Sequence, residues 1–356
     1  MDNKSLFPEL VDIYFQPIVV DYYTRKEEQG YHFLADLTPE YSIDGSWASI
    51  TNEARNIKAD IIPLDSSIPL KSANPVRTAS GEVPKVATAR QLNESKLTAF
   101  SQLLKLKGPD SDVVIDRLFE HTRDVINGQM EEYERMYLQG LSTGYMTAGE
   151  DVNVGQATRV DFGYLADNKL NASVVWGTTN ADPLADIEAV LEAARVKGVA
   201  LGIAKMDRAT FNNLRNSDVM KAFFDPNAVN PRALNFDQLN SVMQSQYGMS
   251  IQIIEKTIKA EKDGVITNIT PWAAGQIIFA PSNQQIGKFV WTELAEMSFP
   301  VGDTTYQRTG PESSILVKKY RDNTPALSEQ TASESRALPV ISNVNEIFKL
   351  DTTAVA

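Results

Sequence analysis

Two histidines are the residues of this chain best suited to acid–base or metal chemistry near neutral pH. They are His32 and His121, and the 356 residues include no cysteine. Disulfides, thiolate metal sites and cysteine nucleophiles are therefore excluded, and a Ser-His-Asp triad would have to use one of these two rings. Neither histidine belongs to a recognisable catalytic motif, so we predict that both are solvated and that neither is catalytic.

Carboxylates are the second set of groups that could do chemistry. Asp112, Asp116 and Glu120 recur at helical spacing just after Asp110, and such a row could bind a cation. The first-turn carboxylates are better explained by the positive end of a helix dipole. The sequence contains no phosphate-binding glycine loop, no serine nucleophile elbow and no zinc-binding His-Glu helix motif. It therefore predicts no cofactor, no metal ion and no enzymatic activity.

Composition and charge narrow the class of protein further. Hydrophobic residues make up 42% of the chain and charged residues 22%, as in a globular protein with a large core. The formal net charge is -12, and no basic tract offers the clustered lysines and arginines that bind nucleic-acid phosphates. Because no run of about 18 apolar residues occurs, we expect no membrane contact and a protein that stays soluble in the cytoplasm where it is made.

One long amphipathic helix, predicted over residues 111–140, organises the middle of the chain. Ser111 or Asp112 can cap its start. Gly140 and Gly144 can end it. Its apolar stripe consists of Ile115, Leu118, Phe119, Thr122, Ile126, Met130, Tyr133, Tyr137 and Leu141. Its opposite face carries Asp116, Arg117, Arg123, Asp124, Glu131, Glu132, Glu134 and Arg135, which we expect to be solvated. A long helix with one apolar stripe requires a sheet along that stripe.

Residues 1–58 are rich in aromatic side chains, and we find no helical period that would organise them. Tyr22 and Tyr23 are two of these aromatics. Aromatic side chains in an extended segment without its own core must pack elsewhere. The segment therefore either docks on another molecule or packs back on its own domain, and the sequence leaves both interpretations open.

The pattern of residues 59–95 predicts a hairpin-like excursion from the fold. Pro69 and Asn74-Pro75 interrupt its strand-forming residues, which suits a protruding loop better than a central strand. Its basic residues are Lys71, Arg77, Lys85 and Arg90. We predict that these four, together with Tyr22 and Tyr23, contact neighbouring molecules in an assembly. The alternative is a solvated surface hairpin on a monomer.

Residues 181–325 have the alternation of helix and strand typical of a compact α/β domain. Asp182-Pro183 opens a helix, and Asp263-Gly264 marks the turn of a hairpin. Residues 326–336 are polar and favour a helix, whereas 338–350 predict a final pair of strands. We expect these last strands to return to the sheet that lies against the long helix.

Five stretches of the sequence carry a family resemblance. They are Ala59-Asp-Ile-Ile-Pro-Leu-Asp65, Ala79-Ser-Gly-Glu-Val-Pro-Lys85, the helix end Glu132–Gly144, the strand-then-helix Gly202–Leu214, and the terminal stretch from Leu338 to Leu350. In this order they resemble the major capsid protein E family of tailed phages, the lambda head-protein type. The resemblance covers roughly residues 55–356, and its specificity lies in the order of the parts.

The resemblance implies an α+β fold of the tailed-phage major capsid type. Its parts would be an N-terminal arm (1–58), an extended β-hairpin loop (59–95), a peripheral domain (96–180) whose spine helix lies on a sheet, an axial domain (181–325) and a C-terminal return to the peripheral domain (326–356). It also implies hexamers and pentamers that form an icosahedral shell around double-stranded DNA, in a virion assembled in the host cytoplasm.

Two departures from the family limit what the resemblance carries over. The sequence has no long helical leader, so we expect the scaffold to be a separate protein, acting with a portal and with a decoration protein where one is used. No Lys–Asn cross-linking pair can be identified. An encapsulin-like compartment, which packages enzymes in place of DNA, is one alternative. An α/β enzyme with an acidic site in residues 181–325, active as a monomer or small oligomer, is the other.

Overall fold

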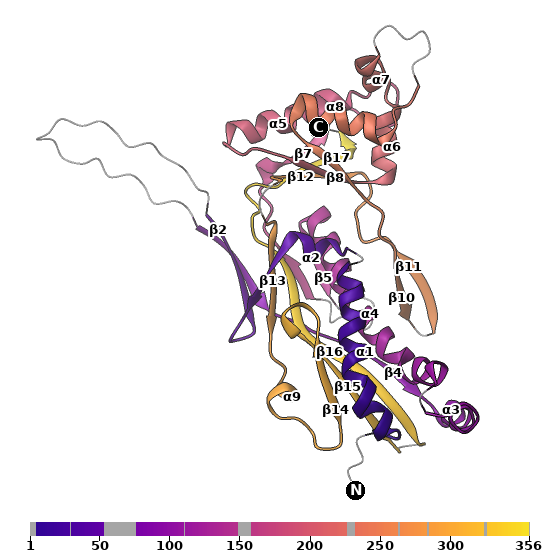
Figure 1. Cartoon of the computed structure of the whole chain (residues 1–356). Helices are drawn as coiled ribbons and strands as arrows, with labels where there is room; N and C mark the ends of the chain where they lie inside the picture. Colours follow the sequence, from indigo (N-terminus) through magenta and orange to yellow (C-terminus); the bar gives the residue numbers. More distant parts are fainter. Residues whose placement is uncertain are drawn as a thin grey trace, which may run out of the picture.

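The computed structural model describes residues 5–28, 30–52, 76–109, 111–148, 158–225, 232–262, 264–282, 285–323 and 326–355. Their helices and strands form two units, each built on one large sheet (Figure 1). Among these residues, no helix combines the length and the apolar character needed to cross a membrane.

The first unit is a six-stranded sheet covered by one long helix. The sheet contains β1 (Leu37–Tyr41), β4 (Lys85–Leu92), β13 (Gly287–Thr292), β14 (Thr305–Thr309), β15 (Ile315–Asp322) and β16 (Ser328–Ile341). β16 is the central strand, because β15 and β4 both pair with residues within its stretch 328–336 and β13 pairs with its residues 336–341. Strands from both halves of the chain therefore meet in this sheet.

The helix predicted over residues 111–140 is confirmed as α4 (Asp112–Thr143). Ser111 is its N-cap residue, and Gly144 ends it in the left-handed conformation that glycine adopts without strain (φ 85°). Every residue of the predicted apolar stripe is buried except Ile115, which is half-buried. α4 lies along β16 and β4, so the expected sheet beneath the helix is present.

Small hydroxyl side chains allow α4 to lie close to β16. Gln129 donates to the carbonyl of Ser333 (3.1 Å), and the Ser333 hydroxyl donates to the carbonyl of Val125 (2.8 Å). Tyr133 and Ser335 share a further buried hydrogen bond. The predicted helical character of residues 326–336 is wrong, because these polar groups find partners in a strand under α4 that they would lack in an isolated helix.

The N-terminal segment is helical up to Asp36, so the prediction of an extended segment was wrong there, whereas β1 and β2 (Ser46–Asn52) further along it are extended strands. Its helices are α1 (Pro8–Glu28) and α2 (His32–Asp36). Val11, Phe15 and Val19 are buried at four-residue spacing, and Phe15 stacks on Phe119 of α4 with ring centroids 6.3 Å apart. This spacing was the missed helical signal. Of the two interpretations left open, packing back on the same chain holds for α1 (Figure 1).

The second unit is a five-stranded sheet with helices on it. Its strands are β7 (Lys169–Ala172), β8 (Ile203–Asp207), β9 (Ser250–Ile254), β12 (Gln276–Ala280) and β17 (Phe348–Val355), in the order β7-β17-β12-β8-β9. Its helices are α5 (Pro183–Val196), α6 (Arg208–Asn216), α7 (Asp218–Phe224) and α8 (Phe236–Tyr247). They contribute to a second, separate hydrophobic core.

The two units are not continuous in sequence, which corrects the predicted boundaries. The range 181–325 contains β13, β14 and β15, which belong to the six-stranded sheet. The range 96–180 contains β7, which belongs to the five-stranded sheet. Of the two C-terminal strands, β16 returns to the sheet under α4 as expected, but β17 pairs with β12 in the second unit. Long-range strand pairing, which local sequence does not encode, decides these memberships.

The remaining elements are short pieces and two-stranded ribbons. They are β2 (Ser46–Asn52) with β3 (Val76–Glu82), β5 (Tyr145–Ala148) with β6 (Thr158–Asp161), β10 (Ile258–Lys262) with β11 (Val265–Ile269), the helices α3 (Glu94–Lys107) and α9 (Ala295–Ser298), and the 3-10 turns η1 (Ala166–Asn168) and η2 (Pro311–Ser313). The predicted hairpin is confirmed as β10 and β11, since Lys262 pairs directly with Val265, although Asp263 of the predicted turn lies outside the described residues.

Candidate assembly site

Two β ribbons project from opposite sides of the molecule. Figure 1 shows β2–β3 on one side and β10–β11 on the other. Within the described residues, each ribbon has only two strands, so its outer edges are unpaired. On β11, Val265 and Ile266 are 63% and 64% exposed. Isolated hairpins are marginally stable and exposed edges invite pairing, so these ribbons are surfaces suited to being covered by another chain.

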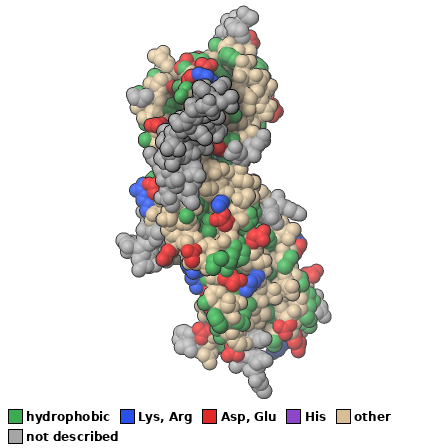
Figure 2. All heavy atoms as spheres, turned by 90° about the vertical axis from the view of Figure 1, so that its left-hand side faces the viewer, with side chains coloured by type: hydrophobic (Ala, Val, Ile, Leu, Met, Phe, Trp, Pro, Cys, Tyr) green, Lys and Arg blue, Asp and Glu red, His purple; other side chains and the backbone are tan. Residues whose placement is uncertain are grey.

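The side from which β2–β3 projects carries no block of a single charge. Figure 2 shows acidic, basic and hydrophobic side chains interspersed on this face, outside the grey atoms. Tyr41 at the end of β1 and Ile43 just after it are exposed apolar side chains. A mixed surface of this kind suits contacts between protein subunits better than attachment to nucleic acid.

The four basic residues predicted to contact neighbours lie in different environments. Lys71 lies outside the described residues, and Arg77 is in β3, where its side chain is not described. Lys85 pairs with Glu334 (2.6 Å), and Arg90 pairs with Glu261 of β10 (3.2 Å). Lys85 and Arg90 thus lie in the six-stranded sheet rather than in a loop, because β4 pairs with β16, and Arg90 ties the β10–β11 hairpin to that sheet. Their part in assembly stays a prediction.

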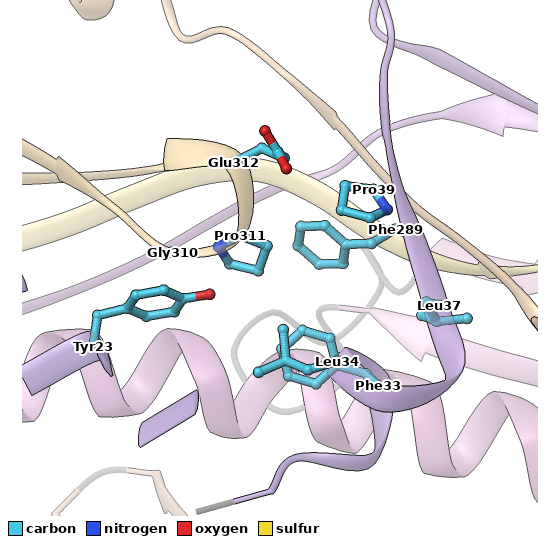
Figure 3. A pocket seen from close by; sticks show the side chains of 9 residues that line it. All are labelled: Tyr23, Phe33, Leu34, Leu37, Pro39, Phe289, Gly310, Pro311 and Glu312. Atoms are coloured by element: carbon cyan, nitrogen blue, oxygen red, sulfur yellow. The ribbon is translucent and has the colours of Figure 1, made fainter. Parts of the chain in front are cut away.

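Tyr22 and Tyr23 both lie on α1 and are half-buried against their own chain. Burial raises the pKa of the Tyr22 phenol, with a further contribution from the nearby carboxylate of Asp124. Tyr23 lines a pocket between α1 and the edge of the six-stranded sheet (Figure 3). Contacts with a neighbour through these two rings likewise remain a prediction.

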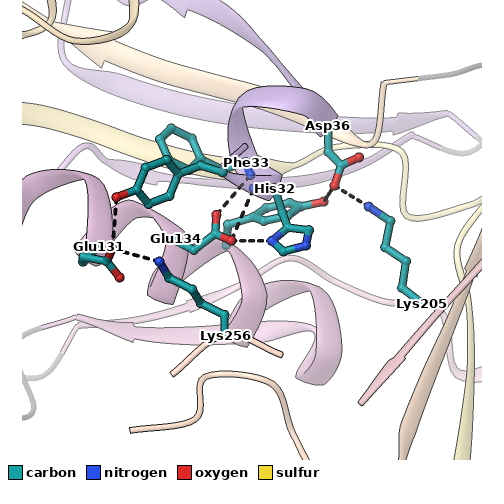
Figure 4. Close-up of polar contacts among 9 residues, drawn as sticks. His32, Phe33, Asp36, Glu131, Glu134, Lys205 and Lys256 are labelled. Carbon is teal, nitrogen blue, oxygen red and sulfur yellow. Dashed lines mark hydrogen bonds and ion pairs between the residues drawn. The ribbon is translucent and has the colours of Figure 1, made fainter. Parts of the chain in front are cut away.

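A buried polar network joins the two units, and its first part centres on Asp36 at the end of α2. Tyr137 of α4 donates to Asp36 Oδ2 (2.6 Å), and Lys205 of β8 forms an ion pair with the same oxygen (Figure 4). The Lys205 side chain is only 1% exposed. Burial, and next the charge of Asp36, hold the pKa of Tyr137 well above its usual value, so its hydroxyl remains a donor. A lysine inside an otherwise apolar strand was the sequence signal for this contact.

The second part of the network caps α2 with a carboxylate from α4. Glu134 accepts hydrogen bonds from the backbone amides of His32 (3.3 Å) and Phe33 (3.2 Å), and it lies 2.5 Å from His32 Nδ1. Tyr31, the N-cap residue, makes no capping hydrogen bond with its side chain. Glu134 therefore does for α2 what a capping side chain normally does, and it is buried for that reason.

The third part connects α4 to the segment after β9. Glu131 accepts hydrogen bonds from the hydroxyl of Tyr31 (3.0 Å) and from Lys256 (2.8 Å), and the Lys256 ammonium lies 4.7 Å from the centre of the Tyr31 ring. Burial, and then the charge of Glu131, raise the pKa of Tyr31. Together the three parts fix α2, α4 and the second unit relative to one another (Figure 4).

This network corrects two predictions about charged residues. Glu131 and Glu134 do not belong to a solvated face of α4, because α2 and the second unit cover them. His32 is not simply solvated but bonded to Glu134. His121 is half-buried rather than solvated, and its pKa is lowered by burial first and by Lys96 second. In each case the side chain is less exposed than predicted because segments distant in the sequence pack against it.

The start of the N-terminal segment is attached to the sheet through Glu329, a buried carboxylate that also forms an ion pair with Lys319. Glu329 of β16 accepts hydrogen bonds from the Ser5 hydroxyl (2.5 Å) and the Leu6 amide (2.9 Å). Lys319 Nζ lies 4.0 Å from Glu329 Oε1 and donates to the Leu118 carbonyl (3.3 Å). Both charged side chains are fully buried, so each offsets part of the cost of burying the other.

The buried lysine predicts a rise in stability at alkaline pH. Burial lowers the pKa of Lys319 from 10.5 to about 8, against the opposing effect of Glu329. Between these values the unfolded chain binds a proton that the folded chain has released, so stability increases as pH rises. From about pH 7.5 to about pH 9.5, the free energy of unfolding of the wild type should rise by about 2 kcal/mol more than that of Lys319→Met.

Urea unfolding at the two pH values measures this difference. Lys288→Met, which removes a half-exposed lysine of β13 that pairs with Glu40, is the control and should keep the wild-type pH dependence. Parallel pH profiles of wild type and Lys319→Met would show that Lys319 is not held in the buried environment described above.

The comparisons with known proteins agree with this architecture. The family model of phage major capsid protein E matches residues 68–352. The chain belongs to this family. The family resemblance found in the sequence is thereby confirmed, and the protein is a structural subunit of a phage capsid, located in the virion. No curated protein matches the sequence of the chain.

Solved structures show the same fold at low sequence identity. A protein from an Escherichia coli CFT073 prophage, assigned as its capsid protein, aligns with a TM-score of 0.53 and 11% identity over 94% of this capsid protein and 97% of that chain. A phage-related protein from Bordetella bronchiseptica RB50 aligns with a TM-score of 0.54 and 12% identity over 95% and 96%. The predicted α+β capsid fold is confirmed, and the encapsulin-like alternative is not favoured.

Proposed function

We propose that this capsid protein assembles head to tail into hexamers and pentamers, which form an icosahedral shell around double-stranded phage DNA. The observation that carries the proposal is the pair of ribbons, β2–β3 and β10–β11, on opposite sides of one subunit (Figure 1). Two different surfaces on opposite sides give a heterologous contact, and such contacts close into rings when the rotation permits.

The two units have separate roles in this proposal. The five-stranded unit faces the centre of each ring as the axial domain, and the six-stranded unit with α4 forms the periphery. Support comes from the family resemblance and from the junction network, which holds the two units in one orientation through Lys205 and Lys256. A fixed orientation is needed if every subunit of a ring is to present the same surfaces.

The remaining partners in this proposal follow from the charge of the chain and from the family resemblance. The net charge of -12 suits a container that must not bind its DNA tightly. A separate scaffold protein, a portal and, where one is used, a decoration protein complete the proposed assembly. The scaffold, portal and decoration proteins would each bind the shell and not a catalytic site.

We also infer that the role is structural rather than enzymatic. Among the described residues, no three histidines, aspartates or glutamates are grouped so that they could hold a metal ion. The buried charged side chains at the junction are each bonded to a partner that positions a helix or strand. These bonds support a structural use of His32 and of the charged side chains around it.

Replacing residues 53–75 with an Asn-Gly turn should preserve the fold and prevent shell formation. Asn52 and Val76 are directly paired across β2 and β3, so a two-residue turn can join them. The change removes Lys71 but keeps β3 and β4, which the fold requires. Circular dichroism and the urea midpoint should match the wild type, while electron microscopy should show particles for the wild type only.

Two results would contradict the proposal in different ways. Normal shells from the variant would exclude a role for residues 53–75 in assembly. A wild-type protein that remains monomeric with scaffold and portal present would exclude the proposed function itself.

A further inference from the structure

A pocket with both apolar and polar surface lies between the N-terminal helices and the edge of the six-stranded sheet. It has a volume of about 230 Å³ and is lined by Tyr23, Phe33, Leu34, Leu37, Pro39, Phe289, Gly310, Pro311 and Glu312 (Figure 3). Most of this lining is aromatic, aliphatic or proline. Glu312 is exposed and brings the pocket's one carboxylate. The pocket therefore suits an apolar side chain that is followed or preceded by a cation.

The backbone that holds Glu312 is in an uncommon conformation. Glu312 (φ 50°) and Ser313 (φ 60°) are consecutive non-glycine residues with positive φ, directly after Gly310-Pro311. Such conformations are costly for residues with a Cβ and persist mainly where the surrounding structure or a function requires them. Here the strained turn places the carboxylate of Glu312 at the pocket.

A matching projection occurs elsewhere on the same chain, at the end of α3. Leu106 is 81% exposed and lies between Lys105 and Lys107, which are also exposed. Neither lysine has an ion pair or hydrogen bond with the described part of the chain. Figure 1 shows α3 at one end of the molecule, away from α2 and β13, which line the pocket, so a folded subunit cannot fill its own pocket with Leu106.

We propose that the end of α3 of one subunit docks in this pocket of a neighbouring subunit. Leu106 would enter the pocket over the packed rings of Phe33 and Phe289, and Lys105 or Lys107 would pair with Glu312. The proposal rests on the proposed function, since it needs subunits that assemble, and it names one contact between them. The two surfaces differ, so the contact is head to tail and can extend through a shell.

Charge favours this occupant over the other exposed apolar segments. Phe299 is 80% exposed, but Glu296 and Asp303 lie in the same segment and would face Glu312 with like charge. Val196 is 75% exposed between two basic residues, yet both already have partners in the chain: Arg195 binds Glu192, and Lys197 binds Asn168. Only the end of α3 combines an exposed aliphatic side chain with basic neighbours that lack partners among the described residues.

Cysteine cross-linking gives the direct test, because the chain contains no cysteine of its own. In the variant Leu106→Cys with Glu312→Cys, the introduced thiols should meet across the contact. Oxidised particles should then give a ladder of covalent multimers on a denaturing gel. The matched control, Val196→Cys with Glu312→Cys, should remain monomeric on that gel. Intact particles without a ladder from the first variant would overturn the proposal while leaving the proposed function standing.

Charge reversal provides a second test in solution. Glu312→Lys and the pair Lys105→Glu with Lys107→Glu should each lower particle yield at least tenfold, whereas Val196→Asp should not. Subunits of the two defective kinds, when mixed, should recover part of the assembly, because every contact between unlike subunits joins opposite charges. Unchanged urea midpoints of the unassembled subunits would exclude misfolding as the cause. Wild-type yield from either charge-reversed variant would overturn the proposal, and absence of particles from wild type would instead count against the proposed function.

Discussion

Replacing Asp36 with alanine should cost about 3–5 kcal/mol of folding stability, the usual loss when one partner of a buried ion pair is removed. Asp36 is the only carboxylate that the described structure pairs with Lys205, whose side chain is almost completely buried. The change also leaves the hydroxyl of Tyr137 without its acceptor. Because Lys205 belongs to the second unit and Asp36 to the first, the loss should loosen their junction.

The matched control removes the charges but keeps the shape. In Lys205→Met with Asp36→Asn, neither residue is charged, and the amide oxygen still accepts from Tyr137. Replacing both partners of a buried pair is often neutral, so this double variant should recover most of the stability lost in Asp36→Ala. The urea midpoints of the wild type, Asp36→Ala and the double variant measure how much stability is recovered. Equal loss in both variants would mean that the cost comes from losing the ion pair itself and not from leaving Lys205 without a compensating charge.

Phe119→Ala should cost about 3–5 kcal/mol, the typical loss for a buried aromatic side chain. Phe119 is fully buried between the sheet and α1, where it stacks with Phe15 and lies 5.6 Å from the ammonium of Lys319. Its removal would leave a cavity at the point where α1, α4 and β15 meet. A loss of this size is a large part of the stability of a typical domain.

Val113→Ala is the matched control on the same helix. Val113 is exposed, so the same kind of truncation should change stability by less than about 0.5 kcal/mol. Glu131 would be a poor control, because it binds Tyr31 and Lys256. Soluble yield, urea midpoint and particle number should all fall for Phe119→Ala alone. Equal stability of the two variants would show that the predicted stripe of α4 is not buried.

Both predictions concern the same property of a shell subunit, the fixed placement of its parts. Asp36 joins the two units, and Phe119 joins the N-terminal helix to α4. A subunit with either contact weakened could still form its secondary structure, but its assembly surfaces would no longer hold one geometry. We therefore expect particle yield to fall more steeply than helix content in both variants.

Features encoded within a few neighbouring residues were predictable from the sequence. The three- and four-residue spacing of Leu118, Phe119, Thr122 and Ile126 identified α4, and Asp263-Gly264 identified the hairpin between β10 and β11. The order of these parts, with the stretches that resemble the capsid family, was sufficient for the fold class and the general function. Such patterns can be read from the sequence because helix periodicity and turn preferences depend on residues only a few positions apart.

Features that depend on distant pairing were decided only by the tertiary structure. Residues 326–336 favour a helix locally but form part of β16, where α4 satisfies their hydroxyl groups. Glu134 looked solvated until α2, about a hundred residues earlier, was found to need its carboxylate as a cap. Lys205 meets Asp36 across 169 positions of sequence. Because burial and charge pairing arise from contacts between such distant segments, no local pattern could specify them, and the junction of the two units emerged only in the folded chain.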